Sequence, residues 1–130
     1  MPELPEVETT RRGIAPVLEG ARIRELVVRD RRLRWPIPRG LEKRLCQQEI
    51  TALHRRAKYL LLETTAGTAL IHLGMSGSIR IVDPKSAPEK HDHFDIVTTQ
   101  GDAVRFNDPR RFGSLLWGGA DPAKHPLLAK

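Results

Sequence analysis

The apolar positions of the chain keep a helical period at its start. The residues that recur on one helical face are Leu4, Val7, Ile14 and Leu18. They predict a helix from residue 5 to about 18, which Gly20 ends and which Pro16 kinks or shortens. A second, short helix is expected over 41–45, where two leucines four positions apart can both face inward.

Further along, the apolar residues fall into short runs separated by turn residues, which is the pattern of strands joined by close turns. Two of the runs, 59–62 and 69–71, are continuously apolar, as expected for strands buried between two layers. Eight or so short strands with few helices predict a β-sandwich or a β-barrel. The predicted strands span 23–29, 50–56, 58–64, 68–73, 78–82, 93–99, 103–107 and 114–117.

The segment 29–35 combines a high density of arginine with alternating apolar residues. As a strand, it would place Leu33 and Trp35 on one face and two arginines on the other. The favoured interpretation is a solvated arginine face on an edge strand. Contact with backbone phosphates is the alternative.

Composition and charge narrow the function classes. The 130 residues form one domain by size and carry a formal net charge of +6. Most of the excess lies in residues 1–65, which hold 14 basic against 9 acidic side chains, and this charge favours a polyanionic partner. The single Cys46 excludes a disulfide framework and a four-cysteine zinc site. With no signal peptide and no membrane-length apolar run, these features predict a cytoplasmic protein.

The first residues bring a candidate nucleophile together with carboxylates. If the initiator methionine is removed, Pro2 becomes a secondary amine that is far less basic than lysine, so more of it is uncharged and nucleophilic at neutral pH. Glu3 lies next to it and is placed to move protons. The same residues also suit a plain helix start, because Pro5 fits the first turn and Glu6 complements the helix N-terminus.

Five blocks of sequence stand in a distinctive order. They are PELPEVET at 2–9 with RRG at 11–13, RRAKYL at 55–60, HLGMSG at 72–77, KHDH at 90–93 and DPRRFG at 108–113. In order and spacing they resemble the bacterial formamidopyrimidine-DNA glycosylases, also called 8-oxoguanine DNA glycosylase/AP lyases. The resemblance runs from residue 2 to about 117.

The resemblance implies a fold that is mainly β with flanking helices, namely a two-layer antiparallel β-sandwich with an N-terminal helix. It implies a catalytic N-terminal domain at 1–117 and the start of a linker at 118–130, which in the family leads to a helix-two-turn-helix and zinc-finger half. No cofactor is implied for this chain, since the family's one structural zinc belongs to that further half. The implied partner is damaged double-stranded DNA, bound by a monomer without membrane association.

The resemblance also assigns roles to single residues in the removal of oxidised purines such as 8-oxoguanine and formamidopyrimidines. Pro2 would attack C1′ of the damaged nucleoside, Glu3 would handle protons at the sugar, and Lys58 would assist strand cleavage. The implied DNA contacts are His72, Met75, His91, Arg110 and Phe112.

For several of these residues the sequence also permits a purely structural role. Lys58 can extend from a strand edge, a buried His72 would merely need a hydrogen-bond partner, and Met75 and Phe112 can be tucked into the core. His91 and His93 have the spacing of a pair of metal ligands, but no third ligand is evident, so no metal site is predicted.

Two function classes therefore stay open. The first is a glycosylase with AP lyase activity, and the second is a non-catalytic basic DNA-binding module. For the isolated 130 residues we expect weak, salt-sensitive DNA binding and negligible base excision.

Overall fold

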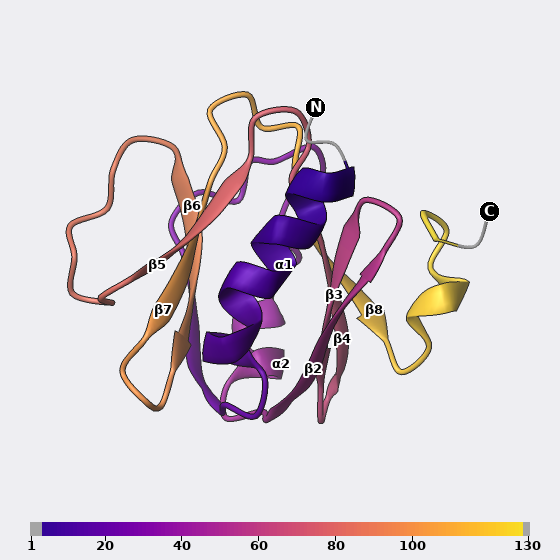
Figure 1. Cartoon of the computed structure of the whole chain (residues 1–130), viewed down its shortest axis with the longest axis horizontal. Helices are drawn as coiled ribbons and strands as arrows, with labels where there is room; N and C mark the ends of the chain where they lie inside the picture. The colour runs from indigo at the N-terminus through magenta and orange to yellow at the C-terminus, as the bar shows by residue number, and fades with distance from the viewer. Residues whose placement is uncertain (1–3, 129–130) are drawn as a thin grey trace.

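The chain folds into two four-stranded antiparallel sheets that face each other, as seen in the computed structural model, which describes residues 4–128 (Figure 1). The first sheet has the order β1-β6-β7-β5, with β1 at Ile23–Val28, β5 at Ser78–Val82, β6 at Asp92–Thr98 and β7 at Ala103–Asn107. The second has the order β2-β3-β4-β8, with β2 at Ile50–Arg56, β3 at Tyr59–Thr64, β4 at Gly67–His72 and β8 at Ser114–Gly119. The predicted antiparallel β-sandwich is confirmed.

Two helices close the open sides of the sandwich (Figure 1). Helix α1 (Leu4–Leu18) contacts the edge strands β2 and β5, which belong to different sheets. Helix α2 (Leu41–Leu45) contacts β1, and its Arg44 lies 5.2 Å from the centre of the Trp117 ring on β8. Both leucines of α2 are buried, as the sequence predicted. A short 3₁₀ helix, η1 (Pro122–Lys124), follows β8.

The core lies between the sheets, where alternate side chains of β3 point inward. Strand β6 is buried along its whole length, because the loop 83–91 covers part of its sheet's outer face. On that face Asp95 accepts hydrogen bonds from Arg29 at 2.7 Å and from Arg105 at 2.9 Å. Burial alone would raise the pKa of the Asp95 carboxyl, but these two guanidinium groups hold it below its ordinary value.

Helix α1 differs from the prediction in two respects. It runs through Pro16 to Leu18, so the expected shortening at the proline is wrong. Pro16 is exposed in the last turn, where only one backbone hydrogen bond is lost, and the next turn is closed by a 2.8 Å bond from the Glu19 N–H to the Ala15 carbonyl. Leu4 is 43% exposed and does not join the core. Gly20 ends the helix at φ 82°, as predicted.

The edge strand expected over 29–35 is wrong, because this segment is part of an irregular loop, here called the 29–40 loop. The Asp30 carboxylate accepts a hydrogen bond from the Arg32 N–H at 3.0 Å and so competes with strand pairing. The loop instead turns back on itself, with the Ile37 N–H donating to the Arg31 carbonyl at 3.0 Å. Within residues 4–128, no helix has the length and apolar character needed to cross a lipid bilayer.

Candidate functional site

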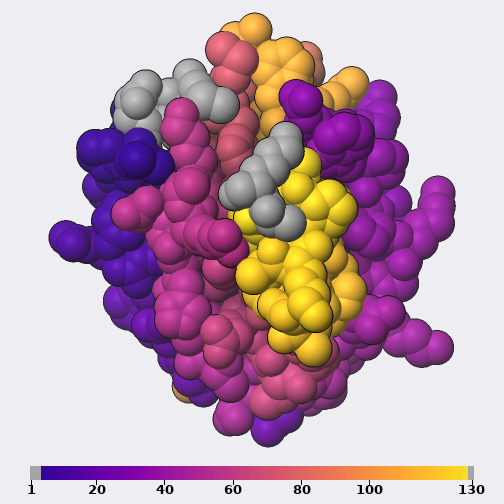
Figure 2. All heavy atoms as spheres, turned by 90° about the vertical axis from the view of Figure 1, so that its right-hand side faces the viewer, coloured from indigo at the N-terminus to yellow at the C-terminus, as the bar shows by residue number. Residues whose placement is uncertain are grey.

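Three loops gather at the end of the sandwich where α1 begins (Figures 1 and 2). They are the 29–40 loop, the 73–77 loop between β4 and β5, and the 108–113 loop between β7 and β8. The predicted catalytic residues Pro2 and Glu3 lie outside the described residues. Within residues 4–128, the candidate site consists of these three loops and the turn that carries Lys58.

The 73–77 and 108–113 loops contact each other through backbone atoms. Gly74 has φ +66°, and a Cβ added to it would lie 2.6 Å from the Gly113 nitrogen and 2.6 Å from the Phe112 carbonyl carbon. A Cβ on Gly113 would lie 2.7 Å from the His72 carbonyl oxygen. Only glycine allows so close an approach, and the contact fixes the spacing between the two loop tips.

The buried carboxylate of Asp108 ties the same two loops together. It accepts hydrogen bonds from the Ser76 hydroxyl at 2.7 Å and from the Gly113 N–H at 2.7 Å. It also accepts one from the Arg110 N–H at 3.2 Å. Ser76 and Asp108 were not predicted as site residues, although both belong to the blocks that carry the family resemblance. The three hydrogen bonds make the paired loops a preorganised unit.

The tips of these loops present three side chains to the outside. Met75 is 44% exposed and Phe112 is 41% exposed, so neither is tucked into the core. The Arg110 guanidinium is exposed as well and lies 5.1 Å from the centre of the Phe112 ring. Exposed apolar side chains held on a rigid loop are typical of a surface that meets a partner.

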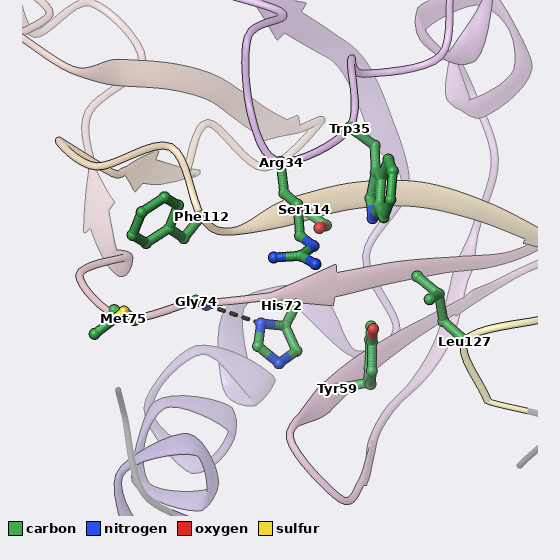
Figure 3. Close-up of a pocket in the computed structure, with 9 residues that line it drawn as sticks. All are labelled: Arg34, Trp35, Tyr59, His72, Gly74, Met75, Phe112, Ser114 and Leu127. Carbon is green, nitrogen blue, oxygen red and sulfur yellow. Dashed lines mark hydrogen bonds between the residues drawn. The ribbon is translucent and has the colours of Figure 1, made fainter.

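A cavity of about 420 Å³ opens beside the tips and is shared by several elements (Figure 3). Arg34 and Trp35 enter it from the 29–40 loop, which is attached to the 108–113 loop by a 3.0 Å bond from the Arg34 N–H to the Gly113 carbonyl. Cationic and aromatic groups therefore line one hollow, which suits an anionic ligand with flat rings. The lining residues are Arg34, Trp35, Tyr59, His72, Gly74, Met75, Phe112, Ser114 and Leu127.

The imidazole of His72 is held in a defined protonation state within this cavity. Its Nδ1 accepts a hydrogen bond from the Gly74 N–H at 2.9 Å (Figure 3). Burial lowers the pKa of His72, and the positive charges of Lys58 and Arg34 lower it further. The ring is therefore neutral at pH 7, with its proton on Nε2, where it can be donated to an anion.

Lys58 lies on the two-residue turn between β2 and β3, after Ala57, whose φ is +51°. Its strand neighbour Tyr59 pairs with His72 across the sheet, and the two rings meet edge to face at 4.8 Å. The hairpin therefore brings Lys58 to the margin of the cavity. Burial raises the pKa of the Tyr59 hydroxyl, so the ring stays neutral there.

The two histidines of the KHDH block, His91 and His93, lie in different environments. His91 lies in the loop before β6 with φ +70°. His93 is fully buried, and its ring nitrogens lie 3.0 Å from the carbonyl oxygens of Asp30 and Asp108. Both nitrogens are therefore engaged by backbone. Over residues 4–128, no group of three or more His, Cys, Asp or Glu side chains is arranged to hold a metal ion.

The aromatic and cationic lining of the cavity was not predicted from the sequence. Arg34 and Trp35 were expected on a solvated edge strand, and Tyr59 was expected on a buried strand. The only available signal was the adjacency of an arginine and a tryptophan in a basic run, since the cavity itself depends on loops far apart in sequence.

Comparison with known proteins places these features in one family. A sequence model of the formamidopyrimidine-DNA glycosylase N-terminal domain matches residues 1–115. The formamidopyrimidine-DNA glycosylase of Stutzerimonas stutzeri is 59% identical over 129 residues, which are 99% of this chain and 47% of that protein. The homologous enzyme of Shewanella amazonensis is 58% identical and is covered over 48% of its length. The chain thus spans about half the length of these curated relatives.

Solved structures support the same family assignment as the sequence relatives. The Lactococcus lactis formamidopyrimidine-DNA glycosylase bound non-covalently to DNA with an AP site superposes with a TM-score of 0.80 at 31% identity, over 88% of this chain and 44% of that one. The same enzyme in complex with Fapy-dG DNA gives a TM-score of 0.79 at 30% identity, over 88% of this chain and 43% of that one. With its fold, its motifs and its relatives in agreement, this chain belongs to the formamidopyrimidine-DNA glycosylase family and carries its N-terminal domain.

Proposed function

We propose that this chain is the catalytic N-terminal half of a DNA-repair glycosylase with AP lyase activity, which removes oxidised purines such as 8-oxoguanine and formamidopyrimidines. The observation that supports this best is the group of Met75, Arg110 and Phe112, exposed on two loops that Asp108 holds together. Family membership supplies the chemical context. We further propose that the protein works as a monomer on DNA in the bacterial cytoplasm.

The exposed side chains suit the step in which a damaged nucleotide leaves the duplex. Extruding a nucleotide costs a few kcal/mol, and groups that fill the gap offset part of that cost. Met75 and Phe112 offer apolar surface that can replace the lost stacking. Arg110 offers hydrogen-bond donors to the orphaned cytosine, and its position against the Phe112 ring lets the two side chains enter the gap together.

The cavity suits the backbone of the extruded nucleotide. A neutral His72 can donate its Nε2 proton to a phosphate oxygen, and the ammonium group of Lys58 adds positive charge at the same margin. His91, in the loop before β6, is proposed as a further backbone contact. These residues would position the sugar without reading the base sequence.

The bond-breaking steps are assigned to the N-terminus. The secondary amine of Pro2 attacks C1′ while the C1′–N9 bond breaks, and the purine leaves after taking up a proton. Once the amine has lost its proton, C1′ is held as an aminal between the Pro2 nitrogen and O4′. Opening of the C1′–O4′ bond, with a proton delivered to O4′, then gives an iminium ion, which acidifies the C2′ proton. Loss of that proton expels the 3′ phosphate by β-elimination. Glu3 moves protons at the sugar, and Lys58 stabilises the charges that develop during cleavage.

A chimera tests this proposal directly. Residues 1–130 are joined to the C-terminal half of the Stutzerimonas stutzeri relative, and the product is incubated with a duplex that contains 8-oxoguanine opposite cytosine. We expect release of the base and cleavage of that strand, with no cleavage of the undamaged duplex, and loss of base release in Glu3→Gln. Specific binding without any cleavage would instead identify the chain as a non-catalytic DNA-binding module.

A further inference from the structure

The turn that carries Lys58 is held in a conformation that its own sequence does not favour. Ala57 has φ +51°, in the left-handed region, which costs an L-residue about 1–2 kcal/mol relative to the right-handed one. Such a conformation persists where neighbouring groups hold it. Here the guanidinium of Arg55 donates a hydrogen bond from Nη1 to the Ala57 carbonyl at 2.9 Å, across the turn.

The same guanidinium reaches helix α1. Its Nε donates to Oε1 of Glu8 at 3.1 Å, so one planar group joins the second turn of the helix to the hairpin tip. Glu8 also accepts hydrogen bonds from Arg11 at 2.7 Å and from Arg12 at 2.9 Å. The bond from Arg11 is the main reason that the pKa of Glu8 falls to about 2, with smaller contributions from Arg12 and Arg55, so the carboxylate stays charged across the working pH range.

These contacts connect two parts of the proposed active site. Helix α1 begins at Leu4, directly after the proposed nucleophile and proton carrier in sequence, and Lys58 directly follows the carbonyl that Arg55 holds. A shift of the hairpin relative to the helix would therefore change the distance between the N-terminus and Lys58. A misplacement of about 1 Å can slow a positioned reaction by roughly 100-fold.

We propose that Arg55 is a positioning residue for strand cleavage, which acts by bridging Glu8 to the turn that carries Lys58. This inference rests on the proposed function. Arg12 provides a matched control, because its guanidinium binds the same carboxylate and, in the part of the chain that the structure describes, has no hydrogen bond to the hairpin. Loss of Arg12 removes one partner of Glu8 and leaves the bridge in place.

The test compares Arg55→Met, Arg55→Lys and Arg12→Met in the chimera. Each variant, at saturating concentration, is given DNA with a preformed abasic site, so that DNA affinity and base removal do not limit the rate. Strand cleavage is timed in a single turnover, and a parallel sample with borohydride measures the trapped covalent adduct. Thermal unfolding of each variant is recorded as well.

We expect Arg55→Met to slow cleavage about 10-fold or more while the yield of trapped adduct is kept, since misplacement affects Lys58 and spares the amine. Arg12→Met should cleave within about twofold of the unsubstituted chimera, the effect expected of an exposed ion pair. Arg55→Lys should rescue only part of the rate, because an ammonium group lacks the planar fork that binds the carboxylate and the carbonyl at once.

Equal cleavage rates for Arg55→Met and Arg12→Met would overturn the inference. So would a parallel loss of adduct, cleavage and thermal stability in Arg55→Met, because that outcome would mean a structural role alone. If the unsubstituted chimera gives neither adduct nor cleavage, the proposed function itself fails, which is a distinct result.

Discussion

Replacement of Gly74 by alanine tests whether the close contact between the 73–77 and 108–113 loops organises the site. The substitution adds one carbon at a position with φ +66°. That carbon would lie 2.6 Å from the Gly113 nitrogen, 2.6 Å from the Phe112 carbonyl carbon and 2.8 Å from the Phe112 carbonyl oxygen. All three are backbone atoms, so no side chain can rotate away, and the loops must separate.

The expected cost has two parts. The left-handed conformation costs an alanine about 1–2 kcal/mol, and forcing a carbon into a filled site costs about 1–3 kcal/mol more. The sum of about 2–5 kcal/mol is a large fraction of the roughly 5–15 kcal/mol that stabilises a domain. Gly20→Ala separates the two parts, because Gly20 has φ +82° and a Cβ added there meets nothing within 4 Å.

Urea unfolding of the two variants, followed by fluorescence of Trp35 and Trp117, measures both costs. We expect Gly20→Ala to lose about 1–2 kcal/mol and Gly74→Ala to lose about 1–3 kcal/mol more than that. In the chimera, Gly74→Ala should also lower base release, because Met75 and Phe112 no longer enter the duplex together. If Gly74→Ala costs no more than Gly20→Ala, the contact between the loops does not fix the site.

Three further predictions concern the helix, the buried ion pair and the cavity. Gly13→Ala should raise the free energy of unfolding by about 1 kcal/mol, because Gly13 lies inside α1 and a Cβ added to it meets nothing within 4 Å. An unchanged urea midpoint would contradict this prediction. Arg105→Met should lower the free energy of unfolding by about 1.5–3 kcal/mol, because the fully buried Asp95 loses its hydrogen bonds from Arg105 and keeps those from Arg29. A loss below 1 kcal/mol by urea titration would argue against the role of Arg105. His72 has a lowered pKa in the folded state, so as the pH falls the imidazole is protonated first in the unfolded chain. The stability that His72 contributes should therefore be complete above about pH 6.5 and should be lost as the pH falls through the pKa of His72 in the folded state. His72→Gln should therefore flatten the change in urea midpoint between pH 7 and 5, and an identical pH slope in both proteins would refute the assignment.

Much of the fold could be predicted because the apolar pattern is local. Strands such as β2 and β7 have the predicted bounds, since their alternation and flanking turn residues lie within a few positions of each other. The prediction from the apolar pattern was wrong where a side chain competed with strand pairing for a backbone N–H. Asp30 bonds the Arg32 N–H and diverts a segment that alternates like a strand.

The site was less accessible to such reasoning because it depends on contacts between distant residues. Local sequence could not determine whether Met75 and Phe112 are buried, because they lie on two loops that are distant in sequence and pack against each other. The hydrogen bond between Ser76 and Asp108 joins residues 32 positions apart. Residue types could therefore be predicted from the motifs, whereas their arrangement could not.

The alanine at position 57 illustrates the same limit. Its sequence context predicts only a short turn after β2. The left-handed backbone there, and the bridge from Glu8 through Arg55 that accompanies it, are properties of the folded chain. When a group on another helix or strand positions a side chain, the local sequence pattern cannot predict it.

The position of the covalent bond between protein and DNA decides whether Pro2 is the nucleophile. The chimera is treated with borohydride during reaction with an 8-oxoguanine duplex, digested with protease and nuclease, and its modified peptide is sequenced by mass spectrometry. We predict a single sugar remnant on the nitrogen of Pro2, in a chain that has lost Met1. A remnant on Lys58 or another lysine, or efficient cleavage by a chain that retains Met1, would contradict it.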